Sequence, residues 1–117
     1  MIFDYYLHND ILLLRVEGDL LGLPHEAALV RIARLHLNEN VKHCAVDLSD
    51  IKHINSRGMS LLIRILNLVD HLHGNMVLIN PPAQTKKLLK ITKLDLAFVT
   101  VDTRSEGVRL LRQQARG

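Results

Sequence analysis

The sequence contains one cysteine and no tryptophan, and aromatic residues fill only 3% of its 117 positions. A single cysteine excludes an internal disulfide and any metal site that needs several thiolates. The scarcity of aromatic rings argues against a nucleic-acid surface on which bases stack. Cys44 lies in the apolar run Cys44-Ala45-Val46, so we expect it to be a buried, unreactive thiol.

Motifs of common nucleotide-binding and hydrolytic enzymes are also missing. The sequence has no G-x-x-x-x-G-K-[ST], G-x-G-x-x-G, G-x-S-x-G or H-E-x-x-H. Asp47 follows an apolar run, as the phosphorylated aspartate of a receiver domain does, but only Asp19 stands where such a site needs an acidic pair to hold a cation. His71 and His73 are two apart, so on a helix they point in different directions. We therefore expect neither an enzyme nor a cofactor or metal site.

Long hydrophobic runs are absent as well. No segment approaches the roughly 20 apolar residues of a membrane-spanning helix, and an N-terminus that carries Asp4 does not resemble a signal peptide. We expect a cytoplasmic protein without membrane insertion. The 48% of hydrophobic residues suit one compact domain with an aliphatic core.

The net charge of +3 is unevenly distributed along the chain. Residues 1–56 hold five Lys/Arg against eight Asp/Glu, whereas residues 57–117 hold ten against four. The densest basic group has the spacing of a solvated helix face, although an anionic partner is an alternative. It consists of Lys86, Lys87, Lys90 and Lys93. No direct contact with nucleic acid is expected.

Hydrophobic periodicity predicts the element order ββαβαβαβα. The predicted strands are residues 3–7, 11–17, 41–48, 76–79 and 98–101. The predicted helices cover residues 28–35, a long apolar segment from Ser56 that Gly74 ends, a segment after Pro82 that includes Leu88, Leu89 and Ile91, and residues 103–114.

This order predicts an α/β fold in which an N-terminal hairpin precedes a mostly parallel sheet with crossover helices. Ligands and partners of such sheets gather at the loops after the carboxyl ends of the strands. Residues 48–58 form one of these predicted loops, and Ser56 lies near its end.

Ser56 has two interpretations. It is a favoured N-cap residue, whose oxygen accepts a hydrogen bond from a free amide of the first turn, worth about 1 kcal/mol. The same helix N-terminus favours a phosphate, because its free amides and dipole attract negative charge. A phosphoserine there would add one to two negative charges without melting the helix.

Polar residues spaced by three or four follow Ser56 along the predicted helix: Arg57, Ser60, Arg64, Asn67 and His71. They form either an ordinary solvent face or a docking surface continuous with the serine loop. Arg57 favours the docking surface, since a cation in a first helical turn opposes the dipole unless a phosphate or an acidic partner lies nearby.

The stretch AVDLSDIKHINSRGMSLLI, residues 45–63, resembles the signature of STAS domains, especially of anti-sigma-factor antagonists, D-L-S-x-V-x-x-[ILMV]-D-S-S-G-L-x-x-L. VEGDL at residues 16–20 resembles the family's G-E-L-D segment, and residues 80–94 resemble its S-P-x-V-x-x-L-[FL]-x-x-[ST]-G-L segment. The predicted element order matches the family over the whole chain, so residues 1–117 are expected to be a single STAS domain.

The resemblance implies a switch in transcription regulation. In the family, the first serine of D-S-S-G is phosphorylated by an anti-sigma factor that is also a serine kinase of the histidine-kinase-like ATPase type. The unmodified form binds this kinase and releases the sigma factor, and a serine phosphatase resets the modified form. Ser56 occupies the serine position and Gly58 the glycine position. The partner-binding residues expected from the motif and the polar face are Asp19, Leu21, Asn55, Arg57, Gly58, Ser60 and Arg64.

The sequence departs from the family pattern around this serine. Asn55 replaces the aspartate, Arg57 the second serine and Leu21 an acid, which leaves Asp19 as the carboxylate of its loop; Lys93 replaces a glycine. The loss of these carboxylates lowers the repulsion against a phosphate on Ser56. If the carboxylates of the family orient the serine, however, their loss slows phosphotransfer. The altered acids favour the alternative function, a non-phosphorylated STAS scaffold subunit of a stress-signalling complex or of a lipid or anion transporter.

Overall fold

A five-stranded sheet with helices on both faces makes up the structure, a computed structural model that describes residues 2–116. The strands β1 (Ile2–His8), β2 (Ile11–Leu20), β3 (His43–Ile54), β4 (Met76–Ile79) and β5 (Val99–Val101) lie side by side in sequence order. β1 and β2 form an antiparallel hairpin, and all later neighbours are parallel. The α/β fold expected from the sequence is confirmed.

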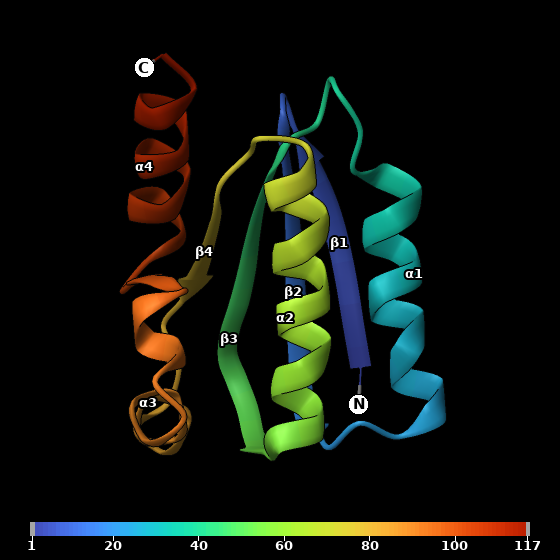
Figure 1. The fold of residues 1–117 in the computed structure, drawn as a ribbon, viewed down its shortest axis with the longest axis vertical. Coiled ribbons are helices and arrows are strands. Elements are labelled where there is room, and N and C mark those ends of the chain that lie inside the picture. Colours follow the sequence, from blue (N-terminus) through green and yellow to red (C-terminus); the bar gives the residue numbers. More distant parts are fainter. Residues whose placement is uncertain (1, 117) are drawn as a thin grey trace.

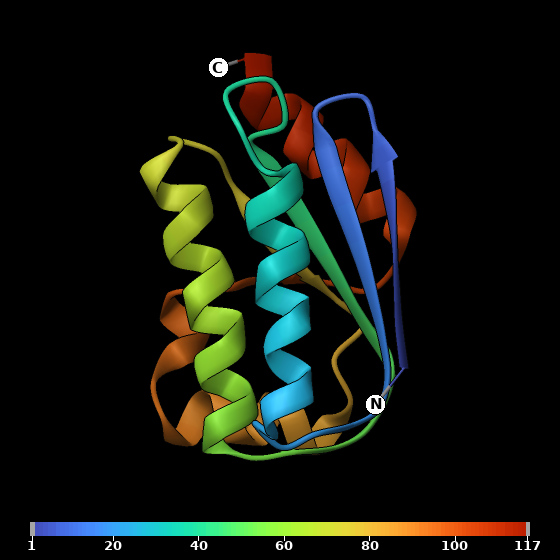
Figure 2. The same ribbon diagram turned by 90° about the vertical axis from the view of Figure 1, so that its right-hand side faces the viewer.

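Four α-helices connect and cover these strands: α1 (Ala27–His36), α2 (Ser56–His71), α3 (Ala83–Ile91) and α4 (Arg104–Arg116). Short 3₁₀ turns at Pro24–Glu26 and Leu94–Leu96 precede α1 and follow α3. α1 and α2 lie on one side of the sheet, and α4 lies on the other (Figures 1 and 2). In the part of the chain that the structure describes, no helix is long and apolar enough to span a bilayer.

Two aliphatic cores fill the space between these layers. The larger one packs α1 and α2 against one face of the sheet, and the smaller one packs α4, through Leu111, against the other. Because both faces are covered, Ile11 to Leu14 are all buried without alternation. Cys44 is fully buried, and burial raises the pKa of its thiol to about 12, so the thiol stays neutral, as expected.

β3 is longer than the sequence pattern predicted. The expected end at Leu48 is wrong, because the strand continues to Ile54 by pairing with β2 as far as Leu20. Register shifts between Arg15 and Glu17, and again after Gly18, break the two-residue alternation in this pairing. The expected loop of residues 48–58 is therefore the end of a strand, one connecting residue and the first turn of α2.

The C-terminus of α2 differs from the expectation that Gly74 takes the left-handed position. His73 takes it, with φ of 60°, while the Gly74 N–H bonds to the Val69 carbonyl at 2.9 Å. Gly74 is required for a different reason: a Cβ there would overlap the Lys42 carbonyl oxygen. Leu35 and Ile91, which belong to the apolar pattern of two predicted helices, are 71% and 69% exposed.

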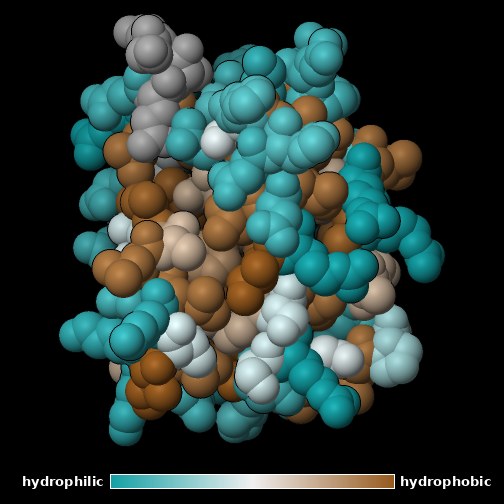
Figure 3. Space-filling model, viewed as in Figure 1, coloured by the Kyte–Doolittle hydropathy of each residue, from teal (hydrophilic) through white to brown (hydrophobic). Residues whose placement is uncertain are grey.

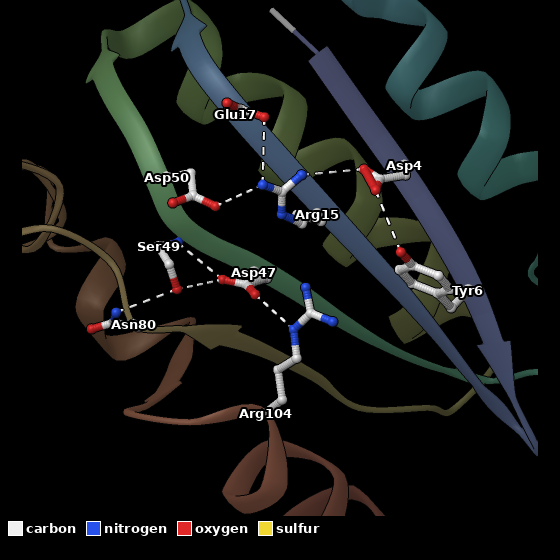
Figure 4. Close-up of polar contacts among 9 residues, drawn as sticks. All are labelled: Asp4, Tyr6, Arg15, Glu17, Asp47, Ser49, Asp50, Asn80 and Arg104. Carbon is white, nitrogen blue, oxygen red and sulfur yellow. Dashed lines mark hydrogen bonds and ion pairs between the residues drawn. The ribbon is translucent and has the colours of Figure 1, made fainter.

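Asp47 links β3 to α4 on the face of the sheet opposite α1 and α2 (Figure 4). Its carboxylate accepts hydrogen bonds from Arg104 at 2.8 Å and from the Ser49 amide and hydroxyl at 3.0 and 2.6 Å. Burial opposes ionisation of Asp47, but the bonds from Ser49 and Arg104 outweigh it and hold its pKa below the usual value.

We predict that Asp47→Asn lowers the free energy of unfolding by about 1 to 2 kcal/mol at pH 7, because it weakens charge-assisted hydrogen bonds. Because the pKa of Asp47 is lower in the native state than in the unfolded state, its ionised carboxylate stabilises the fold at pH values above the unfolded pKa of about 4. This stabilisation is lost as the pH falls through the native pKa. The difference between wild type and Asp47→Asn, measured by urea unfolding, should therefore narrow below about pH 4. Asp95→Asn, a substitution at an exposed position, is the control. If the difference in unfolding free energy between wild type and Asp47→Asn does not depend on pH, Asp47 does not have this role.

Candidate functional site

Asn55, and not Ser56, caps the N-terminus of α2. Asn55 is the one residue between β3 and α2, its backbone is extended, and its side-chain oxygen accepts from the Gly58 N–H at 2.9 Å. The N-cap interpretation of Ser56 is therefore wrong: β3 reaches Ile54, so helical backbone angles begin at Ser56 itself.

Ser56 is the first residue of α2, and it is exposed. Its carbonyl accepts a bond from the Ser60 hydroxyl at 3.0 Å, but its own hydroxyl has no hydrogen-bond partner among the side chains that the structure describes. No carboxylate among the described residues contacts the hydroxyl as an activating base would. This geometry suits a hydroxyl that accepts a group from another protein more than it suits a catalytic nucleophile.

The segment after β2 packs tightly against this first turn. The Asn55 side chain donates to the Leu21 carbonyl at 3.1 Å. Gly22, with φ of 80°, lies so close to Arg57 that a Cβ on Gly22 would overlap the Arg57 Cβ. Gly58 is buried, and a Cβ there would overlap the carbonyl oxygen of Leu20. Gly58 thus serves close packing, while Leu21 and Arg57 reach the surface beside Ser56.

Glu26 fixes this segment, and the sequence reasoning missed it. The Glu26 side chain is 1% exposed, and its carboxylate accepts from the amides of Leu21, Gly22 and Leu23 over 2.5 to 3.0 Å. Asp19 is therefore not the only carboxylate of this loop. The signal in the sequence was Pro24 followed by Glu26: proline favours the first helical position, and a glutamate two residues later reaches back to free amides.

Asp19 and His53 flank the site at the ends of β2 and β3. They are paired in register across the two strands, and Asp19 Oδ1 lies 2.8 Å from His53 Nδ1. Both side chains are exposed, so the pair is open to a partner. Asp19, a predicted site residue, and His53 thereby lie at the strand ends that lead into the Leu21 segment and into Asn55.

The polar face predicted along α2 is present. Arg57, Ser60, Arg64, Asn67 and His71 are all exposed. Ser60 lies one turn beyond Ser56, whereas Arg64 lies two turns beyond it and faces α1, with Arg34 lining the same hollow. Of the predicted site residues, Leu21, Asn55, Arg57 and Ser60 lie at the first turn of α2 around Ser56, Asp19 contacts His53 nearby, Gly58 is buried beneath the turn, and Arg64 stands apart.

No metal centre is apparent at this site. Among the side chains that the structure describes, no three of histidine, cysteine, aspartate or glutamate gather in a way that would hold a metal ion. The exposed helix N-terminus, with its unpaired first amides, is the feature that attracts an anionic group.

Comparison with known proteins supports the interpretation of the fold. The family model described as "STAS domain" matches residues 3–107. A crystal structure from Thermotoga maritima, described as a candidate anti-sigma factor antagonist, has a TM-score of 0.81 and 25% identity over 94% of each chain. The anti-sigma factor antagonist SpoIIAA in its unphosphorylated form has a TM-score of 0.78 and 16% identity over 96% of this chain and 97% of its own.

SpoIIAA from Bacillus in its phosphorylated form is also similar, with a TM-score of 0.69 and 16% identity over 92% of this chain and 97% of that one. At 16% identity, the SpoIIAA structures establish the likeness of fold alone. A search of functionally curated proteins finds no match.

We predict that Glu26→Gln lowers the free energy of unfolding by about 2 kcal/mol, because three backbone amides lose a charged acceptor. The amide NMR signals of Ser56 and Arg57 should shift as well, since the segment held by Glu26 packs on them. The exposed Glu39→Gln should change neither quantity. A loss below about 0.5 kcal/mol, the range of ordinary surface substitutions, would show that Glu26 does not hold the segment.

Proposed function

Because the chain belongs to the STAS domain family, we propose that it is an anti-sigma-factor antagonist controlled by phosphorylation. In its unphosphorylated form it binds an anti-sigma factor that is also a serine kinase of the histidine-kinase-like ATPase type. This binding releases a sigma factor and so regulates transcription. The chain is the substrate of the kinase, and of a serine phosphatase that resets it, and not an enzyme.

The observation that carries this proposal is the free hydroxyl of Ser56. A serine at a helix start is ordinarily occupied in capping, but here Asn55 fills that role at 2.9 Å from the Gly58 amide. The Ser56 side chain is left exposed and without a hydrogen bond in the described part of the chain. The hydroxyl is therefore accessible to a kinase and costs no intramolecular bond when it is modified.

Electrostatics favours the modified state at this position. A phosphate on Ser56 would carry about −1.5 to −2 charges at pH 7 and would lie at the positive end of the α2 dipole. Arg57 follows directly and has no carboxylate partner among residues 2–116, so a phosphate would find a neighbouring cation. The fold can accept such a group, since the similar protein SpoIIAA exists in a phosphorylated form.

The same modification would change what a partner meets. The proposed partner-binding surface around Ser56 combines the Asp19–His53 pair, the Leu21 segment, Asn55, Arg57 and Ser60, with Arg64 at its far edge. A dianion in the middle of this surface reverses its local charge. A partner that fits the unmodified surface would then have to bury the phosphate without a counter-charge or place a like charge against it. Either effect typically weakens the free energy of binding by several kcal/mol.

We predict that incubation with ATP and the cognate kinase adds one phosphate to the wild type and none to Ser56→Ala, as measured by intact-mass spectrometry. Ser60→Ala is the matched control, because Ser60 is an exposed serine one turn away on the same face. It should still accept one phosphate. If Ser56→Ala is phosphorylated as well as the wild type, the assignment of Ser56 is wrong.

Binding distinguishes this switch from a scaffold. We expect Ser56→Asp to weaken the kinase complex at least tenfold, which is about 1.4 kcal/mol, in calorimetric titrations. A stable complex that neither Ser56→Ala nor Ser56→Asp disturbs, but that Arg64→Glu weakens, would identify a STAS scaffold subunit instead.

A further inference from the structure

Besides Arg57, three exposed arginines of α1 and α2 lack an ionic partner among the described residues. Arg31 and Arg34 on α1 and Arg64 on α2 have no carboxylate within 4.0 Å among residues 2–116. Two arginines on the opposite side of the sheet differ: Arg15 contacts three carboxylates, and Arg104 contacts Asp47 at 2.8 Å (Figure 4). Arg109 and Arg112 of α4 likewise have no carboxylate partner among the described residues, so unpaired positive charge is present on both sides of the sheet.

These arginines line two adjoining hollows between α1 and α2, of about 390 and 210 Å³. Both hollows include Arg34 and Arg64, so they form one continuous depression, here called the arginine groove. Arg31 lies at one end and His71 at the other. In the space-filling view, hydrophilic side chains over α1 and α2 alternate with hydrophobic surface (Figure 3).

The floor of the arginine groove is apolar, and its rim is cationic. The floor is formed by Val30, Leu37, Leu68 and Leu72, which are buried or half-buried. No acidic residue lines either hollow. α1 has 10 residues, so a groove along it is about 15 Å long at about 1.5 Å per residue.

We propose that the arginine groove binds an acidic amphipathic helix of a partner protein. Leucine-type side chains of such a helix would cover the apolar floor, spaced three and four residues apart as in other helix-in-groove complexes. Its carboxylates would pair with the guanidinium groups of Arg31, Arg34 and Arg64, which can bind them bidentately. Three turns of helix match the length of the groove.

A lipid surface fits the groove less well. Val30 is 2% exposed and Leu37 is 8% exposed, so these side chains are recessed below the arginines and cannot insert into a bilayer. A single-stranded nucleic acid also fits poorly, because the lining contains no aromatic ring on which a base could stack.

The arginine groove goes beyond the proposed phosphorylation switch. Arg64 is eight residues from Ser56 along α2, which is about 12 Å at about 1.5 Å per residue. This exceeds the Debye length of about 8 Å at physiological ionic strength, so a charge at Ser56 is largely screened at Arg64. Binding in the groove should therefore depend little on the state of Ser56.

The test uses a fluorescein-labelled helical peptide of about 14 residues, four turns, with leucines spaced three and four apart and glutamates on both flanks. Fluorescence anisotropy should show saturable binding to the full chain, weakened by added NaCl. Arg34→Glu should raise the Kd at least tenfold. Lys87→Glu, the same charge change at an exposed site on α3 outside the groove, and Ser56→Asp should each change the Kd less than twofold.

Two further arms separate specific docking from general attraction. A peptide of the same composition with its leucines scrambled should bind at least tenfold more weakly. A peptide in which lysines replace two of the glutamates should regain affinity for Arg34→Glu, which also shows that this variant is folded.

The proposal is overturned if the acidic peptide does not bind, if Arg34→Glu and Lys87→Glu weaken it equally, or if the scrambled peptide binds as well. It is also overturned if phosphatidylglycerol vesicles bind the chain in an Arg34-dependent way and the peptide does not. The peptide experiment needs neither the kinase nor a phosphate on Ser56, so its failure can be told apart from failure of the kinase experiment.

Discussion

The pairing of β2 with β3 is the constraint on which the rest of this structure depends. The two strands remain in parallel register from Ile11 opposite His43 to Leu20 opposite Ile54, through two register shifts. Because both strands end together, the start of α2 is forced against the end of β2, where Gly58 leaves room for the Leu20 carbonyl. The position of Ser56 at the surface follows from this backbone packing and not from a flexible loop.

Some arginines of this structure are paired with carboxylates, and others are not. On the side of α4, Arg15 and Arg104 are matched by carboxylates, and Asp47 ties the sheet to α4 (Figure 4). On the side of α1 and α2, Arg34 and Arg64 have no such partner in the described residues. Paired charges hold elements of the fold together, whereas unpaired ones remain available for another molecule.

The element types and order could be predicted because the apolar runs are long and regular. The boundaries could not, and each error has a local cause. β3 was predicted too short because register shifts hide the alternation after Asp47. Gly74 was assigned the left-handed position that His73 occupies, since glycine is favoured both for such an angle and for close packing, and a sequence does not separate the two.

The sequence by itself determined the α/β class, the STAS signature and the presence of a serine and a glycine at the start of a helix, because these depend on local pattern. Only the tertiary structure decided which residue caps that helix. Asn55 does so because the strand before it ends at Ile54, and Ser56 is free as a result. Glu26 likewise acts through amides three to five residues earlier, which the fold bends around its carboxylate. Roles of this kind depend on where backbone from different elements meets, and a linear pattern does not encode that.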